Sequence, residues 1–295
     1  MKKIITTLFL VCAAVCTQAQ LLWKISGNDL EKSSYVFGTH HLAPYAILDS
    51  VKGYRAAYNE CERVIGEVAM SEMRSPETMG MMQRMMMIDE DSITLKSLFT
   101  PEEYELVKKT CQEYVGLHID MVPKMKPAYI TNNLVVVLYI KHMPNYKSKE
   151  QLDSFLQEMG SNLGKQIAGL ETLEFQMNML FNNSPLERQA ELLVCTISDI
   201  DNTVKQAIEL TDAYMNQQLD KLLEIAYHKT NTNCDPLPGE MEAMIDNRNM
   251  AWAEKLPAMM KEMASFVAVG ALHLPGEKGL INLLKEAGYT VEPIW

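Results

Sequence analysis

The sequence predicts an α/β (α+β) fold, in which a central mixed β-sheet starts with an N-terminal hairpin, is covered by helices and carries a large helical insertion. Short runs of β-branched, aromatic and small apolar residues, typical of covered strands, occur near both ends of the chain. Longer segments with helical periodicity separate them, and this alternation favours helices packed over a sheet. Because 47% of the 295 residues are hydrophobic, the chain can bury a substantial core.

The first two expected strands form a hairpin around the turn residues Gly27, Asn28 and Asp29. The later strands are short apolar runs between helical segments, and a proline or glycine follows several of them. The expected strands span 21–26, 34–39, 63–69, 166–170, 266–271 and 290–294.

Helices are expected where apolar residues recur at helical spacing between residues that can start or stop a helix. Thr100 can cap a helix that begins at Pro101, Pro185 can start another, and Gly288 can end the last one. The expected helices cover 48–61, a segment from Pro101, 127–142, 150–163, 184–229, a segment through Arg248 and Trp252, and 277–287.

The N-terminal segment 1–19 is interpreted as a signal peptide, because Lys2 and Lys3 precede an apolar run and small residues lead up to Ala19. The apolar run is shorter than the ~20 residues that span a bilayer. We therefore expect an exported protein, periplasmic or secreted, with no stable membrane anchor after cleavage. Residues 20–295 are expected to form a single domain, with the helical insertion at about 72–164 and 174–262.

Charge and cysteine content restrict the function classes further. Removal of Lys2 and Lys3 would change the formal charge from −11 to −13, which argues against binding to nucleic acid or to anionic lipid. The cysteines left after export can pair in several ways and form no C-x-x-C motif, so neither a redox motif nor a thiolate zinc site is predicted. They are Cys61, Cys111, Cys195 and Cys234.

Polar residues stand near the carboxyl ends of predicted strands. His41 and His273 each end a Gly-x-x-His step, which begins at Gly38 or Gly270. Glu67 and Glu171 lie near the ends of two further strands. In open parallel sheets, ligands bind beyond the carboxyl ends of the strands, so these residues could share one site. Two imidazoles and one or two carboxylates suit a divalent transition metal that keeps a position open for water. The alternative is that each residue only caps a strand or hydrogen-bonds a loop.

The choice between the adjacent histidines His40 and His41 follows from strand geometry. Neighbouring side chains of a strand point to opposite sides, and the Gly-x-x-His spacing selects His41. His40 is the second choice, and its alternative role is a loop hydrogen bond. The remaining histidines have no comparable setting and are interpreted as ordinary surface or helix-end residues. They are His118, His142 and His228.

Several of these segments together resemble the TraB/GumN family, which includes the Tiki proteins and is grouped with ChaN-like and erythromycin-esterase-like proteins. The resemblance covers essentially the whole mature chain in the expected order. It rests on the hairpin 22–27 leading into 37–42, the strand with Glu67, the segment 169–172 with Gln176, the pair Arg248-Asn249, and the block 269–276.

The resemblance implies an exported metal-dependent hydrolase, a peptidase acting on peptides or proteins. It implies His41, Glu67 and His273 as metal ligands, with Glu67 as ligand or base and Arg248 as a second catalytic group that binds a substrate carboxylate or an oxyanion. Mn, Co and Zn are the expected metals. The supporting residues would be Gly38, His40, Glu171 and Gly270. The alternative is a protein without catalytic activity that sequesters a peptide or haem.

A methionine-rich stretch is not explained by these functions. The positions 79, 82 and 86 fall on one helical face, and flexible thioethers suit an adaptable core. A lid over a peptide site is the second interpretation and a copper site the third. The stretch contains Met79, Met81, Met82, Met85, Met86 and Met87.

Overall fold

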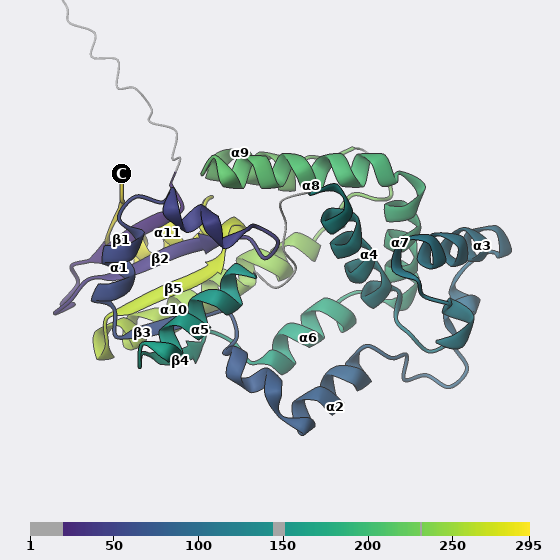
Figure 1. Cartoon of the computed structure of the whole chain (residues 1–295), viewed down its shortest axis with the longest axis horizontal. Coiled ribbons are helices and arrows are strands. Elements are labelled where there is room, and N and C mark those ends of the chain that lie inside the picture. The colour runs from purple at the N-terminus through teal and green to yellow at the C-terminus, as the bar shows by residue number, and fades with distance from the viewer. Residues whose placement is uncertain (1–19, 144–150, 231) are drawn as a thin grey trace, which may run out of the picture.

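The computed structural model describes residues 20–143, 151–230 and 232–295, so the expected signal peptide lies outside it. Its strands form one sheet with the order β4-β3-β5-β2-β1-β6 (Figure 1). They are β1 (Leu22–Ser26), β2 (Ser34–Thr39), β3 (Arg63–Gly66), β4 (Gln166–Gly169), β5 (Ser265–Gly270) and β6 (Thr290–Pro293).

The sheet is mixed, as the sequence predicts. Strands β2, β3, β4 and β5 run parallel to their neighbours in this group, whereas β1 is antiparallel to both β2 and β6. In the register of the β2–β5 pair, Thr39 lies beside Gly270. The carboxyl ends of the parallel strands therefore share one edge, and the two Gly-x-x-His steps leave the sheet side by side.

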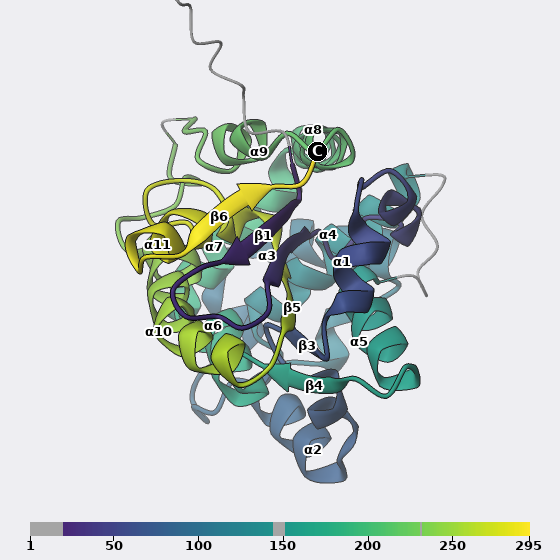
Figure 2. The same cartoon turned by 90° about the vertical axis from the view of Figure 1, so that its left-hand side faces the viewer.

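Helices cover both faces of the sheet (Figure 2). Helices α1 (Tyr54–Glu60) and α5 (Leu152–Asn162) lie on one face, and α10 (Asn247–Glu262) and α11 (Leu280–Glu286) lie on the other. At Gly160 of α5 an added Cβ would lie 2.7 Å from Cγ2 of Val64, so only glycine allows α5 to approach β3 this closely. Together these helices enclose the core of the sheet, which contains Trp23, Phe37, Leu156, Trp252 and Phe266.

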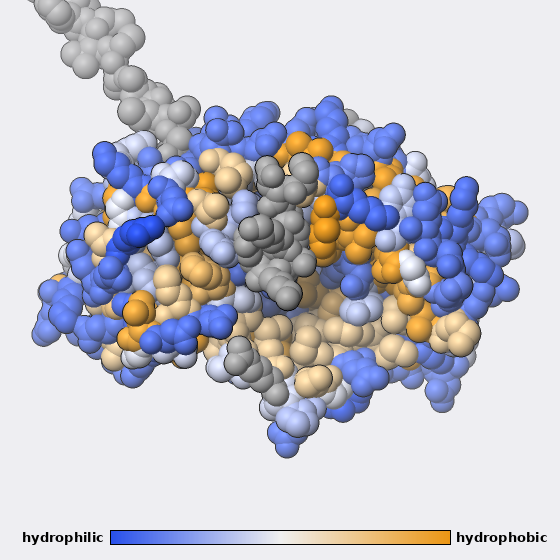
Figure 3. Space-filling view, in the orientation of Figure 1, coloured by the Kyte–Doolittle hydropathy of each residue, from blue (hydrophilic) through white to orange (hydrophobic). Residues whose placement is uncertain are grey.

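The other helices stand beyond the carboxyl edge of the parallel strands (Figure 1). They are α2 (Pro76–Met85), α3 (Pro101–Thr110), α4 (Pro127–His142), α6 (Leu173–Asn182), α7 (Leu186–Ser198), α8 (Ile200–Met215) and α9 (Leu219–Ala226). Part of this helical region has a core of its own, with Leu95, Val107, Ile130, Leu134 and Leu193. Helices α5 and α10, which fall within the expected insertion at 72–164 and 174–262, contribute to the core of the sheet, as do Tyr214 of α8 and Leu219 of α9. On the face that Figure 3 displays, a hollow with hydrophobic residues on its walls lies near the middle of the molecule.

Short helical turns link the main elements. The 3-10 turns are Tyr45–Asp49, Met70–Arg74, Leu95–Leu98, Ile119–Met121 and Ala271–His273, and the π-helical turns are Cys111–Val115 and Glu242–Asp246.

Several helix ends follow directly from sequence chemistry. The side chain of Thr100 accepts from the backbone N–H of Glu103 and forms a capping box at the start of α3. The expected helix 48–61 begins only at Tyr54, because Gly53 has a φ of 76°. The expected helix 184–229 is three helices, since Asp199 caps the start of α8 and Gln217 adopts a φ of 57° before α9. Helix α6 lies outside the helices that the sequence predicts.

The open question of cysteine pairing is resolved by a disulfide between Cys195 and Cys234, whose Cα atoms lie 5.7 Å apart. It joins α7 to the loop that precedes the turn Glu242–Asp246. Cys61 and Cys111 are buried and free. Across the described ranges, none of the helices combines the length and apolar character that a membrane span requires.

Candidate functional site

Glu67 follows β3 directly and is held at the shared edge of the parallel strands by three donors. Nη2 of Arg248 donates to its Oε2 at 2.6 Å, Nε2 of Gln176 donates to the same oxygen at 2.9 Å, and the backbone N–H of Gly270 donates to Oε1 at 2.9 Å. The contact between Glu67 and Arg248 is a buried salt bridge. Helix α5 fixes the chain just beyond it, because Gln157 bonds to backbone atoms of the residues that follow Glu67.

Arg248 on α10 is the centre of the cluster, because every N–H of its guanidinium has a partner. Nη2 donates to Glu67 and, at 2.7 Å, to Oε1 of Glu171, while Nε donates to Oε2 of Glu171 at 3.1 Å. Nη1 donates to the carbonyl of Met244 at 3.0 Å and to Nε2 of His273 at 3.2 Å. In this state the guanidinium can contact a substrate only by giving up one of these bonds.

Trp252 closes the inner side of the cluster, one helical turn after Arg248. Its ring centroid lies 4.6 Å from Cζ of Arg248, so the indole stacks on the guanidinium. The indole N–H donates to Oε2 of Glu171 at 3.2 Å, and the ring lies 4.5 Å from that of His273. These contacts exclude water from one side of the ion pairs, which strengthens their electrostatic interaction.

His273 is held as a neutral imidazole with a defined tautomer. Nδ2 of Asn249 donates to the carbonyl of Lys278 at 2.8 Å, which turns Oδ1 of Asn249 towards Nδ1 of His273 at 2.7 Å. Nδ1 therefore carries the proton, and Nε2 presents its lone pair to the cluster. Burial lowers the pKa of His273 to about 4, and the charge of Arg248 acts in the same direction.

His41 follows β2 and makes a different pair. Its Nδ1 donates to Oδ2 of Asp153 on α5 at 2.7 Å, and Oδ1 of Asp153 accepts from the hydroxyl of Thr39 at 2.6 Å. The charge of Asp153 raises the pKa of His41 to about 9, and the charges of Glu67 and Arg248 also influence it. Since 65% of the His41 side chain is exposed, water screens the pair and weakens it. The Nε2 atom remains open to a ligand.

The carboxylates of Glu67 and Asp153 stay ionised although they are buried. Burial opposes ionisation of Glu67, but nearby His273 and Arg248 hold its pKa below the ordinary value. Because His273 is neutral, Arg248 is the partner that matters at neutral pH. Burial likewise opposes ionisation of Asp153, whose pKa is lowered by His41 and by the Thr39 hydroxyl.

The structure thus brings Glu67, Glu171, Arg248 and His273 into direct contact, and Gly270 supplies a backbone N–H to Glu67. His41 stands near this cluster but bonds to Asp153 instead. Gly38 permits close packing of the two Gly-x-x-His steps, because an added Cβ would lie 3.0 Å from Cα of Ala271.

His40 has a separate environment, as strand alternation indicates. Its Nδ1 accepts from the backbone N–H of Leu42 at 3.1 Å, and its ring meets that of Tyr214 edge-on at 5.4 Å. Burial lowers the pKa of His40 to about 4. The loop hydrogen bond proposed as its alternative role is therefore present.

Sequence reasoning missed Asp153 and Asn249 as site residues. Asp153 lies in the first turn of α5, where an acidic residue is ordinary, so nothing in its local pattern marks it. Asn249 stands next to Arg248 in the segment that carries the family resemblance, and that adjacency is the signal that could have found it. Both residues bond to Nδ1 of a Gly-x-x-His histidine.

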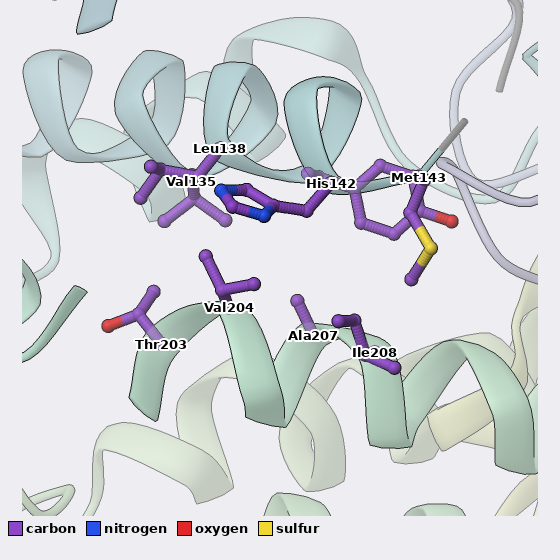
Figure 4. Close-up of a pocket in the computed structure, with 9 residues that line it drawn as sticks. Val135, Leu138, His142, Met143, Thr203, Val204, Ala207 and Ile208 are labelled. Carbon is purple, nitrogen blue, oxygen red and sulfur yellow. The ribbon is translucent and has the colours of Figure 1, made fainter. Parts of the chain in front are cut away.

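His142 has no part in the site. Figure 4 shows it at the end of α4, opposite Val204 and Ala207 of α8, across a cavity of about 10 Å³. Such a volume holds a single water molecule at most. His118 lies 3.2 Å from the side-chain amide of Gln112 on the surface.

The methionine-rich stretch forms a partly buried cluster. No residue of α2 is fully buried, and Met79 is 62% exposed. Met81, Met82, Met85 and Met86 pack against a small buried core made of Val68, Leu173, Met177 and Phe181. Packing is thus the role visible for these four side chains.

The donor set bears on the expected metal in two ways. Within residues 20–143, 151–230 and 232–295 no three His, Cys, Asp or Glu side chains are gathered closely enough to form a ready-made metal site. However, Oε1 of Glu67 lies 3.8 Å from Nε2 of His273, close to the ~3–4 Å that separates two atoms bound to one ion. Both Gly-x-x-His imidazoles also have Nδ1 fixed by a partner, which is how metal-binding histidines are oriented.

Comparison with known proteins defines the family of the chain. Neither curated proteins nor solved structures give a match to it. The model of the TraB/PrgY/gumN family matches residues 21–293, from the first strand of the sheet to the last, and the protein therefore belongs to this family.

Proposed function

We propose that the protein is a metal-dependent hydrolase that cleaves peptide bonds at the edge of the sheet where His41 and His273 emerge. The observation that carries this proposal is the matched orientation of the two imidazoles. Asp153 holds Nδ1 of His41 and Asn249 holds Nδ1 of His273, so each imidazole would bind a metal through Nε2. For His273 this requires that Nη1 of Arg248 first gives up its bond to Nε2.

His41, His273 and Glu67 are the residues that would hold the metal. The charge of the inner cluster supports a cation there, because Glu67 and Glu171 face the single guanidinium of Arg248. One negative charge in this buried cluster thus lacks an internal partner, which favours binding of a cation. A bound divalent metal such as Mn, Co or Zn supplies a water molecule of lowered pKa as the nucleophile.

The other side chains position these groups. Arg248 holds Glu67 and Glu171 in place and donates to Nε2 of His273, so its first role is orientation. Glu67 accepts three hydrogen bonds and has a lowered pKa, which suits a ligand better than a proton acceptor. Release of Nη1 from His273 would let Arg248 meet the negative charge that develops on a tetrahedral intermediate.

Export to an oxidising compartment belongs to the same proposal. The disulfide between Cys195 and Cys234 supports it, because disulfides persist outside the cytosol. The mature chain is expected to begin near Gln20. N-terminal sequencing of the protein made by its natural host tests this, and recovery of Met1 on the folded protein would contradict it.

The test of the metal site compares wild type with His41→Ala and His273→Ala, purified without a histidine tag. Elemental analysis should find a divalent metal in wild type and none in either variant, and cleavage of a peptide library with Mn, Co or Zn should disappear with it. His118→Ala is the matched control, since His118 lies on the surface away from the cluster and should keep wild-type metal content.

Two outcomes would contradict the proposal. If both histidine variants keep the wild-type metal content, the metal is held elsewhere. If metal is bound but no peptide is cleaved, the protein is a binding protein rather than a hydrolase.

A further inference from the structure

Helix α6 has two apolar faces, and only one of them is covered. Leu173, Met177 and Phe181 point into the small core that the methionines of α2 pack against. Met179 and Leu180 lie on the other face and line a cavity of about 290 Å³ between α4, α6 and the turn Glu242–Asp246.

This cavity lies beside the Glu67–Arg248 cluster along two separate elements. On α6, Gln176 donates to Glu67, and Met179 and Leu180 follow about one turn later. On the other wall, the carbonyl of Met244 accepts from Nη1 of Arg248, and Met244 also lines the cavity. The same two elements thus present polar groups to the reaction site and apolar side chains to the cavity.

The chemistry of the walls indicates the kind of ligand. Met179, Leu180 and Met244 are apolar, and methionine adapts its shape to varied partners. The amide side chains of Asn132 and Asn183 also line the cavity, and neither has a hydrogen-bond partner among the described residues. Amides can pair with the N–H and C=O groups of a peptide backbone. An extended peptide with an apolar side chain would therefore fit this cavity, because its side chain would contact the methionines and the leucine and its backbone would bond to the two amides.

We infer that this cavity is a substrate subsite, which receives an apolar side chain such as leucine or methionine from a peptide bound across the Glu67–Arg248 cluster. The inference rests on the proposed hydrolase function and adds the substrate class to it. The volume of about 290 Å³ is at the lower end of ligand pockets, so it fits one or two side chains rather than a folded partner.

Binding to the metal-free mature protein tests this without cleavage. The probes are two fluorescein-labelled hexapeptides that differ only in a central Leu or Ser, and fluorescence anisotropy measures their affinity. We expect the Leu peptide to bind about tenfold more tightly, because one buried aliphatic side chain contributes about that factor. Leu180→Asp should remove the difference by weakening the Leu peptide alone.

The matched control is Phe175→Asp on the same helix. Phe175 is 48% exposed and does not line the cavity, whereas Leu180 is 38% exposed and does. The control should keep wild-type affinity for both peptides. Thermal unfolding checks that each variant is folded; if Leu180→Asp is not, Leu180→Trp, which fills the cavity, should have the same effect on binding.

Equal affinity for the two peptides, or a cavity variant that binds as the control does, would overturn the subsite. The proposed hydrolase and the subsite fail separately. Tight binding of the Leu peptide with no cleavage after metal is restored would contradict the hydrolase only. Cleavage of Leu and Ser peptides with equal kcat/KM would contradict the subsite only.

Discussion

Two buried arginines of this protein, Arg248 and Arg188, each bind a pair of glutamates, yet their surroundings differ. The carboxylates that contact Arg248 are only 10% and 5% exposed, and a neutral imidazole completes the set. The partners of Arg188 are Glu191 and Glu240, at 38% and 21% exposure.

The other bonds of Arg188 show what its pairs do. Its Nη1 and Nη2 atoms also donate to the carbonyls of Asn233 and Asp235, in the loop that the disulfide ties to α7. Arg188 therefore holds a loop in place, and the carboxylates it pairs with are partly exposed to water. An arginine between two carboxylates is thus not by itself a sign of a functional site. Arg248 differs from Arg188 in the burial of its two carboxylates and in its contact with Nε2 of a neutral imidazole.

The largest expected effect is a difference in the free energy of unfolding when each arginine is replaced by alanine. Arg248→Ala leaves Glu67 and Glu171 buried without a cation, and we expect a loss of about 3–5 kcal/mol in the free energy of unfolding. Arg188→Ala should cost less, about 1–3 kcal/mol, because water can replace its bonds to the exposed carboxylates. Urea unfolding monitored by circular dichroism measures both. Equal losses of stability in the two variants would contradict the idea that burial of the carboxylates makes Arg248 the more important of the two arginines.

A smaller effect is expected when one glutamate of each pair is made neutral. Glu67→Gln keeps the shape but faces Arg248 with an amide, and should cost about 1–3 kcal/mol. Under the proposed function it should also abolish metal binding. Glu191→Gln is the matched change in the Arg188 pair and should stay within about 0.5 kcal/mol of wild type. A Glu67→Gln variant with wild-type stability and metal content would contradict the role given to this carboxylate.

The smallest effect concerns the exposed His41–Asp153 pair. In metal-free protein, Asp153→Asn should lower the pKa of His41 from about 9 towards its ordinary value of 6.5, as followed by NMR titration of the imidazole. Because the pKa of His41 is higher in the folded protein than in the unfolded chain, protonated His41 stabilises the fold fully at pH values below about 6.5. This stabilisation is lost as the pH rises through about 9. The free energy of unfolding of wild type should therefore decrease slightly between pH 6.5 and about 9, and that of Asp153→Asn should not. A His41 pKa that does not change would mean that Asp153 is not its partner in solution.

Much of the fold was predictable because the strands carry their own signals. The runs that end at Gly38 and Gly270 are apolar and short, and their parallel pairing follows from the helical segments between them. The same signals located His41, Glu67 and His273 at one edge of the sheet. Glu171 and Arg248 were also identified, although their mutual bidentate contact was not.

The features that the sequence does not predict depend on contacts between residues far apart in the chain. Asp153 reaches His41 only because α5 packs closely on the sheet through Gly160, which no local pattern reveals. Asn249 acquires its role from the carbonyl of Lys278, in the loop before α11. The apolar spacing of the segment 184–229 continues across the breaks at Asp199 and Gln217, so the sequence predicts one helix where the structure has three.

Strand β5 lies between β2 and β3, although it is made from residues near the end of the chain. Until this strand is in place, β2 and β3 have no common neighbour, and the shared edge that carries His41, Glu67 and His273 does not exist. A chain emerging from a ribosome or a translocation channel therefore lacks the candidate site until synthesis is almost complete. Closing a sheet through such distant segments is also a slow folding step. Any shortened product that ends before residue 265 lacks both the central strand and the site.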